Sequence, residues 1–158
     1  MIKRLILVLA TLLTVACSAG SDAGNELEML DGWVRAPIPG RSNTAAYITL
    51  NNASDSDWAL VSVSTDQAAR VELHQHSEDG GMMRMRKVDS VTIAAGRSME
   101  LMPGGYHLML FDVGEHLAHV KAVAFEFSAA DGRQARFLLP LRSVLDGDGM
   151  GSHHGGMH

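Results

Sequence analysis

Residues Val71 to Leu110 read VELHQHSEDGGMMRMRKVDSVTIAAGRSMELMPGGYHLML and hold the strongest structural signals in the chain. Runs such as VELHQH and YHLML alternate between apolar and polar residues, which predicts β-strands, because a strand points successive side chains to opposite faces. The sequence Asp79-Gly80-Gly81 predicts a hairpin turn between two of these strands. A second chain reversal is predicted at residues 103–105, Pro-Gly-Gly.

The rest of the chain continues in the same manner. Short apolar or alternating runs are separated by Gly, Pro, Asn, Asp and Ser, and few stretches have the period of a helix. This pattern predicts an all-β protein, a sandwich or barrel, formed by a single domain over residues 26–145. The length of that segment is sufficient for one hydrophobic core without disulfides. The strands are expected in LEMLDGWVRA, AAYITLNN, WALVSVST, RVELHQH, MMRMRKV, SMELM, YHLMLF, AVAFEFS and ARFLLPLR.

Four side chains are candidate metal ligands: His74, Met85, His107 and Met109. The His-x-Met spacing places His107 and Met109 on one face of a strand and Leu108 on the other. Thioether sulfur is a soft, neutral donor that suits Cu(I), whereas zinc sites use thiolate, imidazole and carboxylate, and calcium and magnesium sites use oxygen. Two imidazoles with two thioethers therefore indicate a copper site that favours the reduced ion.

Other histidines and methionines have simpler explanations. His76 shares a strand face with His74, so it is an alternative first imidazole ligand. His116 and His119 lie in the polar stretch 112–119, where we expect exposure to solvent rather than metal binding. Methionines often fill gaps in a core. Those expected to pack in the core or at its rim are Met82, Met99 and Met102.

The spacing of the four candidates, His74-x10-Met85-x21-His107-x-Met109, resembles the signature of the periplasmic copper chaperones of the PCu(A)C family. The segments GWVRAPIPG, AAYITLNN and PGGYHLML are also similar to that family, and the resemblance covers residues 27–141. It implies a cupredoxin-like (immunoglobulin-like) β-sandwich that carries Cu(I) on these four residues. It also implies delivery of copper to the binuclear copper centre of cytochrome c oxidase. The implied partner is the copper-bearing oxidase subunit or another acceptor, such as a thiol-containing copper assembly protein.

The chain begins with MIKRLILVLATLLTVA, residues 1–16, which we interpret as a secretory signal peptide. Its apolar run is shorter than the roughly 20 residues that a transmembrane helix needs. Cys17, the only cysteine, follows a segment that resembles a bacterial lipobox, so we expect lipidation there, with simple cleavage as the alternative. Ser18 after the cysteine favours the outer membrane, so the expected location is periplasmic with a lipid anchor as the membrane contact. The small polar residues 17–25 predict a flexible tether.

The chain ends in DGDGMGSHHGGMH, residues 146–158, a low-complexity segment rich in His, Met and Gly. Such a composition binds metal without a packed core, so we expect a disordered arm. Imidazole suits Cu(II) as well as Cu(I), and the arm is therefore a candidate Cu(II) site. Its possible ligands are His153, His154, Met157 and His158.

Several functions lack their chemical groups in this sequence. It contains no HExxH, GxSxG, GxxxxGK[ST] or Cys-x-x-Cys motif, so we expect a binding protein rather than an enzyme. The formal charge of -5 argues against nucleic acid as a partner. A blue-copper site needs a Cys thiolate inside the folded domain, which the single Cys17 does not supply. The remaining hypotheses are a copper chaperone, a copper-sequestering or resistance protein that uses the same site, and a structural β-sandwich whose His and Met are incidental.

Overall fold

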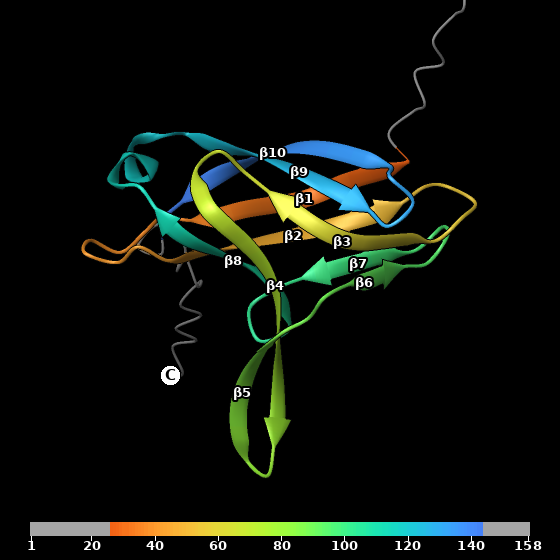
Figure 1. Ribbon diagram of the computed structural model, residues 1–158, viewed down its shortest axis with the longest axis horizontal. Coiled ribbons are helices and arrows are strands. Elements are labelled where there is room, and N and C mark those ends of the chain that lie inside the picture. The colour runs from red at the N-terminus through yellow and green to blue at the C-terminus, as the bar shows by residue number, and fades with distance from the viewer. Residues whose placement is uncertain (1–25, 144–158) are drawn as a thin grey trace, which may run out of the picture.

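A computed structural model describes residues 26–143. The predicted signal peptide, the tether with Cys17 and the His/Met-rich arm fall in residues 1–25 and 144–158, outside the described residues. Within the described part the chain forms strands and one short 3-10 helix (Figure 1). The elements are β1 (Leu27–Arg35), β2 (Thr44–Asn52), β3 (Trp58–Ser64), β4 (Ala68–Asp79), β5 (Met82–Lys87), β6 (Val91–Ile93), β7 (Ser98–Leu101), β8 (Tyr106–Val113), η1 (Glu115–His119), β9 (Ala122–Ala129) and β10 (Gln134–Arg142).

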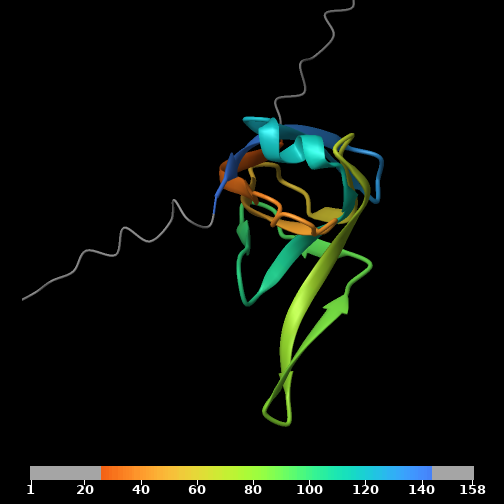
Figure 2. The same cartoon turned by 90° about the vertical axis from the view of Figure 1, so that its left-hand side faces the viewer.

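The strands form two layers that join along one side. One layer has the order β5-β4-β8-β2-β1, with β7 also paired to β2, and the other has the order β10-β9-β3-β6. The layers meet where β1 and β10 run parallel, through the pairs Val34 with Leu141 and Arg35 with Arg142. Seen along its length, the body forms a ring of strands around a central core (Figure 2). The prediction of a β-sandwich or barrel is therefore confirmed.

The core forms because the strands alternate between buried and exposed residues, as the sequence pattern requires. Trp58, Phe125 and Phe127 are fully buried between the layers. Burial of one such large side chain stabilises a fold by about 1.5–3 kcal/mol. From the strands that carry the candidate ligands, Leu73 and Leu108 point into this core. Their neighbours in sequence, including the candidate histidines, consequently point to the outer face of the layer.

Two turns that were predicted from glycine position the candidate ligands. Gly80 and Gly81 have φ values of 61° and 80°, and the flanking residues Asp79 and Met82 pair with each other. Positive φ at both central residues is the type I′ geometry that matches strand twist. The hairpin of β4 and β5 that results extends well beyond the body of the sandwich (Figure 1). The second turn places Gly104 at φ 85°, and a Gly105 N–H donates to the Met102 carbonyl oxygen over 3.0 Å.

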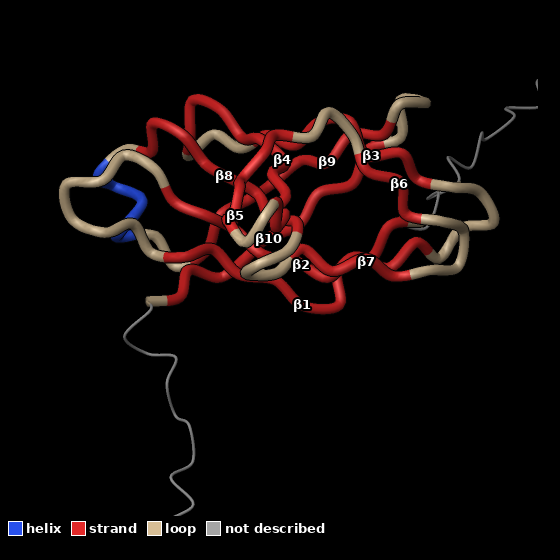
Figure 3. The backbone as a smooth tube through the Cα atoms, turned by 90° about the horizontal axis from the view of Figure 1, so that it is seen from below, coloured by secondary structure: helices blue, strands red, loops and turns tan. Residues whose placement is uncertain are grey.

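The structure adds two elements that the sequence pattern missed. β6 has only three residues and pairs with β3 through Ile93 and Trp58, so it is too short for its alternation to be recognised. The 3-10 helix η1 lies in the stretch 112–119 that was predicted to be a loop, and its Leu117 is fully buried. This helix is the short coil at one end of an otherwise extended backbone in Figure 3. Within residues 26–143, no helix is long and apolar enough to span a membrane.

Candidate metal centre

The four predicted ligands come from three neighbouring strands of one layer. His74 on β4 pairs directly with His107 on β8, and Met109 on β8 pairs with Glu72 on β4. Met85 on β5 pairs with His76 on β4. Residues directly opposite each other on neighbouring strands share a face, and so do residues two apart on one strand. The strand register therefore brings all of these side chains to the outer face of this layer.

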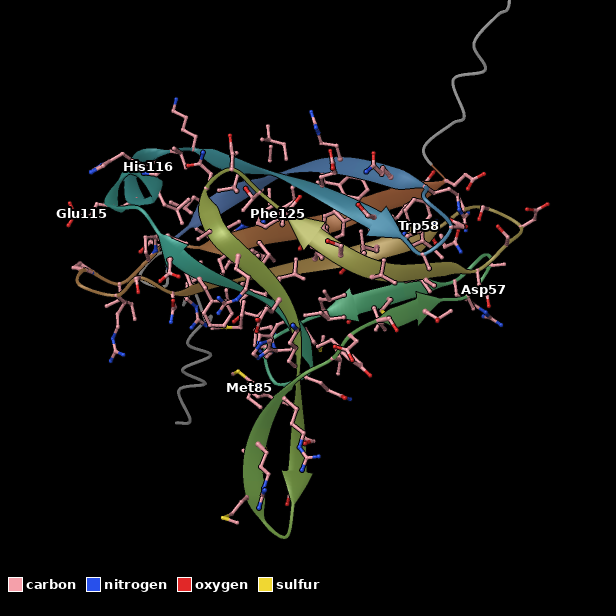
Figure 4. All side chains as sticks on the ribbon, in the orientation of Figure 1. Asp57, Trp58, Met85, Glu115, His116 and Phe125 are labelled. Atoms are coloured by element: carbon pink, nitrogen blue, oxygen red, sulfur yellow. The ribbon has the colours of Figure 1, made fainter. Side chains whose placement is uncertain are left out.

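The exposure of the candidate ligands differs, from the buried His107 on β8 to the exposed Met85 on β5. The His107 side chain is almost completely buried, with 3% of its surface exposed, although it lies on the outer face of the layer. His74, His76 and Met109 are partly exposed, and Met85 is 47% exposed. Figure 4 shows Met85 at the base of the hairpin, where the hairpin leaves the body. The ring of His107 is thus enclosed, and the thioether of Met85 is at the open side of the site.

The three imidazole rings cluster around His107. Its ring centroid lies 4.8 Å from that of His76 and 6.0 Å from that of His74. The His76 ring is therefore nearer to the His107 ring than the His74 ring is. Both rings remain candidates for the first imidazole ligand, as the sequence alone also left them.

His74 is held in one tautomer by a carboxylate. Its Nε2 lies 2.8 Å from Glu72 Oε2, and because a carboxylate only accepts hydrogen bonds, Nε2 carries the proton and donates. This hydrogen bond is the main reason that the pKa of Glu72 is lowered from its usual value, with smaller contributions from Arg70 and Lys87. Nδ1 of His74 is left as the lone-pair nitrogen, and it is buried without a hydrogen-bond partner. Carboxylates often orient metal-binding histidines in this way.

His107 is oriented by a backbone carbonyl. Its Nδ1 lies 3.1 Å from the Gly105 oxygen, which can only accept, so Nδ1 carries the proton and Nε2 is the lone-pair nitrogen. The same carbonyl accepts the backbone N–H of His76 over 3.1 Å, which ties β4 to the turn before β8. Burial lowers the pKa of His107 from its ordinary value of 6.5 and keeps the ring neutral, although its hydrogen bond to Gly105 acts in the opposite direction. Nε2 is buried and has no partner.

Three lone-pair or unassigned imidazole nitrogens at this site lack partners: His74 Nδ1, His76 Nδ1 and His107 Nε2. A buried polar atom without a partner costs about 1–3 kcal/mol, so such a group of atoms at one place needs an explanation. Nitrogen lone pairs on neighbouring rings of one sheet face suit a metal ion. Within residues 26–143, however, no group of three or more His, Cys, Asp or Glu side chains could hold a metal by itself. The donor set therefore needs thioether sulfur, which Met85 and Met109 bring to the same face.

Sequence reasoning missed the two groups that orient the rings. Glu72 could have been found, because it stands two residues before His74 and thus shares its strand face. The Gly105 carbonyl could not, because a backbone oxygen leaves no mark in the sequence. His116 and His119 are exposed on η1, as predicted, and Figure 4 shows His116 beside Glu115, away from Met85.

The remaining methionines differ from each other. Met99 packs against the core, as predicted. Met82 and Met102 are exposed instead, because β5 has no layer to pack against and residue 102 begins a surface turn. The other candidate ligands and the lipidation site, which are His153, His154, Met157, His158 and Cys17, lie outside the described residues.

Residues 27–141 match the family model described as "Putative lipoprotein LpqE-like". Two curated proteins are similar: the "Uncharacterized protein RP573" of Rickettsia prowazekii, 38% identical over 72 residues, and the "Putative lipoprotein Lxx21020" of Leifsonia xyli subsp. xyli, 25% identical over 117 residues. These matches cover 45% and 73% of this chain. They span 40% of the length of the Rickettsia protein and 69% of the Leifsonia protein.

Solved structures share the fold. The solution structure of CuI-DR1885 from Deinococcus radiodurans is 32% identical with a TM-score of 0.60, and the match covers 80% of this chain and 85% of that one. Apo-DR1885 is 28% identical with a TM-score of 0.59 over 93% of this chain and 98% of that one. The copper-bound PCuAC domain from PmoF2, at 17% identity, has a TM-score of 0.61 over 75% of this chain and 93% of that domain and supports the fold alone. The chain therefore belongs to the LpqE-like family and is a β-sandwich of the PCuAC type, as its ligand spacing predicted.

Proposed function

We propose that this protein binds one Cu(I) through His74, Met85, His107 and Met109 and passes it to a copper enzyme. The observation that carries the proposal is the pair of buried, unpartnered nitrogens, His74 Nδ1 and His107 Nε2, on the same sheet face as the two thioethers. Two similar solved structures are of copper-bound proteins, and in one of them the metal is Cu(I). These neighbours are described by the metal they bind, which supports a binding protein rather than an enzyme.

The donor set suits a carrier. Two neutral imidazoles and two thioethers leave the bound ion with its single positive charge, and soft sulfur favours Cu(I) over harder ions. Glu72 and the Gly105 carbonyl fix the two rings, so binding does not have to select their tautomers. Met85 at the open side gives a flexible ligand that an incoming acceptor can displace. An enclosed imidazole, His107, together with an exposed thioether, Met85, suits transfer of an intact ion.

The proposed setting is the periplasm. Cys17 would carry a lipid anchor, with the outer membrane favoured, and relatives described as lipoproteins support such an anchor. The proposed acceptor is the binuclear copper centre of cytochrome c oxidase, reached directly or through a thiol-containing copper assembly protein. The alternative is a copper-sequestering protein, which would use the same site but retain its metal.

X-ray absorption of the Cu(I) form tests the site. We expect scattering from both nitrogen and sulfur, and a spectrum without a sulfur shell would exclude this ligand set. Separate His74→Ala and His76→Ala variants identify the first imidazole, since the variant that loses Cu(I) affinity lacks a true ligand. His119→Ala, on the exposed helix η1, is the matched control and should bind as the wild type does.

Transfer of the metal tests the function. The Cu(I)-loaded protein is mixed with the apo form of a soluble copper-bearing oxidase domain, and the copper in each partner is measured after separation. Movement of copper to the oxidase domain within the mixing time supports delivery. Copper that stays on this protein despite a favourable affinity of the acceptor supports sequestration instead.

A further inference from the structure

A fifth candidate donor, Met83, continues the line of donors outward along the hairpin. Met83 pairs with Glu78, two residue pairs further from the body than the pair of Met85 with His76. Because Met83 and Met85 are two residues apart on one strand, they share a face, and that face is the one that carries the histidines. The outer face of the layer therefore presents His107, Met85 and Met83 in order from the body toward the hairpin tip.

Exposure rises steadily in the same order. His107 is 3% exposed, Met85 47% and Met83 65%. Every residue of β5 is exposed, and the strand is the outermost one of its layer. Large apolar side chains on a protruding, uncovered strand stabilise nothing in the folded body, so packing does not account for Met83. A thioether at this position is accessible to a partner before any other donor of the site.

The spacing allows an ion to pass between the two thioethers. Two residues along a strand are separated by roughly 6.6–6.8 Å. A methionine side chain has three rotatable bonds, so both sulfur atoms can approach one ion without a change in the backbone. The step needs no oxidant or base, because one copper–sulfur bond forms, another copper–ligand bond breaks, and copper remains Cu(I).

We propose that Met83 is an outer Cu(I) ligand through which copper enters and leaves the main site. This inference rests on the proposed Cu(I) function and adds a route to it. An incoming ion meets Met83 first and then moves to Met85. The imidazoles of the main site, including the buried His107, then hold it. In release the order is reversed, and Met83 presents the ion at the hairpin tip. Neither Met83 nor this route belongs to the four-ligand spacing that identified the site.

The chain offers a matched control for this route. Met82 is similarly exposed, at 59%, and is adjacent in sequence. It pairs with Asp79, so it lies on the opposite face of β5 from Met83 and Met85. Leucine keeps the apolar character of methionine and removes the sulfur. Met83→Leu therefore deletes the outer donor, whereas Met82→Leu changes the hairpin to the same extent without touching the route.

The first measurement is the rate at which the Cu(I)-loaded full-length protein loses copper to the chelator bathocuproine disulfonate. Met83→Leu is expected to release copper about tenfold more slowly, the effect of a barrier about 1.4 kcal/mol higher. Its Cu(I) affinity should fall less than that of Met85→Leu. Met82→Leu is expected to match the wild type. Equal release rates in the wild type, Met83→Leu and Met82→Leu would overturn the route and leave the main site intact.

The second measurement detects the outer ligand directly. Ag(I), a redox-inert ion with a similar preference for sulfur, is titrated into the apo protein while the methionine methyl signals are followed by NMR. The Met83 methyl, assigned by its loss in Met83→Leu, is expected to shift together with that of Met85. A Met83 signal that does not move overturns the inference. Failure of Met85 and Met109 to respond would instead overturn the proposed function on which it rests.

Discussion

At the scale of single residues, the proposed site depends on groups outside the set of candidate ligands. Glu72 fixes the tautomer of His74, and the Gly105 carbonyl fixes that of His107. In each ring one nitrogen is occupied by a donor hydrogen bond, so the other keeps its lone pair. The chain thus sets the direction of both imidazoles before any ion arrives.

Replacement of the orienting carboxylate tests this preorganisation. Glu72→Gln is expected to weaken Cu(I) binding by about 10–100-fold, the usual effect of losing a group that orients a ligand. The amide can still accept a hydrogen bond but cannot stabilise the donor with a negative charge. Competition titration against a Cu(I) chelator measures the loss, and Glu115→Gln on η1 is the control. Unchanged affinity in Glu72→Gln would show that His74 is not oriented by this contact.

Copper binding is expected to depend on pH, because the candidate ligands include imidazoles. A proton on Nε2 competes with the metal, so affinity falls once pH drops below the pKa of a ligand imidazole. Cu(I) affinity is therefore expected to be level near pH 7 and to weaken as pH falls through about 6. Burial holds the pKa of His107 below 6.5, so its ring is expected to stay mostly neutral at that pH. NMR titration of the apo protein checks this, and titration of His107 above pH 6.5 would contradict it.

At the scale of elements, the outer strand of the β4–β5 hairpin carries candidate ligands but contributes no buried residue to the core. Met85 and Met83 stand on a strand whose residues are all exposed, while the core is formed by the other strands. Elements with few buried contacts open or shift at low cost. We therefore expect changes in the hairpin to affect copper binding more than global stability.

Gly81 provides the test of this separation. Its φ of 80° is unfavourable for alanine, although nothing lies within 4 Å of the added Cβ, so Gly81→Ala introduces backbone strain alone. We expect weaker Cu(I) binding, because the strain displaces Met85, with little change in thermal unfolding. Gly96→Ala, with a φ of 64° and equally open surroundings in the turn between β6 and β7, is the matched control. Loss of stability without loss of affinity in Gly81→Ala would contradict the separation.

At the scale of the whole molecule, the body and the C-terminal arm have different expected roles. The buried core of the described residues runs from Leu27 to Leu139, and the family match ends at residue 141. The arm's first histidine, His153, follows 12 residues after that point, and a tethered ligand can reach a high local concentration near a neighbouring site. A second, weaker site on this arm, which suits Cu(II) as well as Cu(I), would hand copper to the main site as Cu(I).

Deletion of Gly149 to His158 tests that role. Thermal stability of the apo protein is expected to change little, because the segment has few apolar groups to bury. Cu(II) stoichiometry and the loading rate are expected to fall. The Cu(II) form should also be pale, since no thiolate is present in residues 26–143. Equal stoichiometry and equal loading in both proteins would leave the arm without a role in copper handling.

The sequence alone determined the features that depend on local geometry. Strict alternation placed His107 and Met109 on one strand face, and adjacent glycines specified the hairpin that carries Met85. Ligand spacing identified the family. Each of these follows from the two-residue period of a strand or from the φ values that only glycine adopts readily, which are properties of a few consecutive residues.

Only the tertiary structure decided which residues meet across strands. The register pairs His74 with His107 and His76 with Met85, which puts two histidines near His107 where the motif names one. It also buries His107 on an outer face and leaves β5 uncovered. Pairing, burial and exposure depend on contacts between segments that are distant in the chain, and the local pattern is the same for several registers.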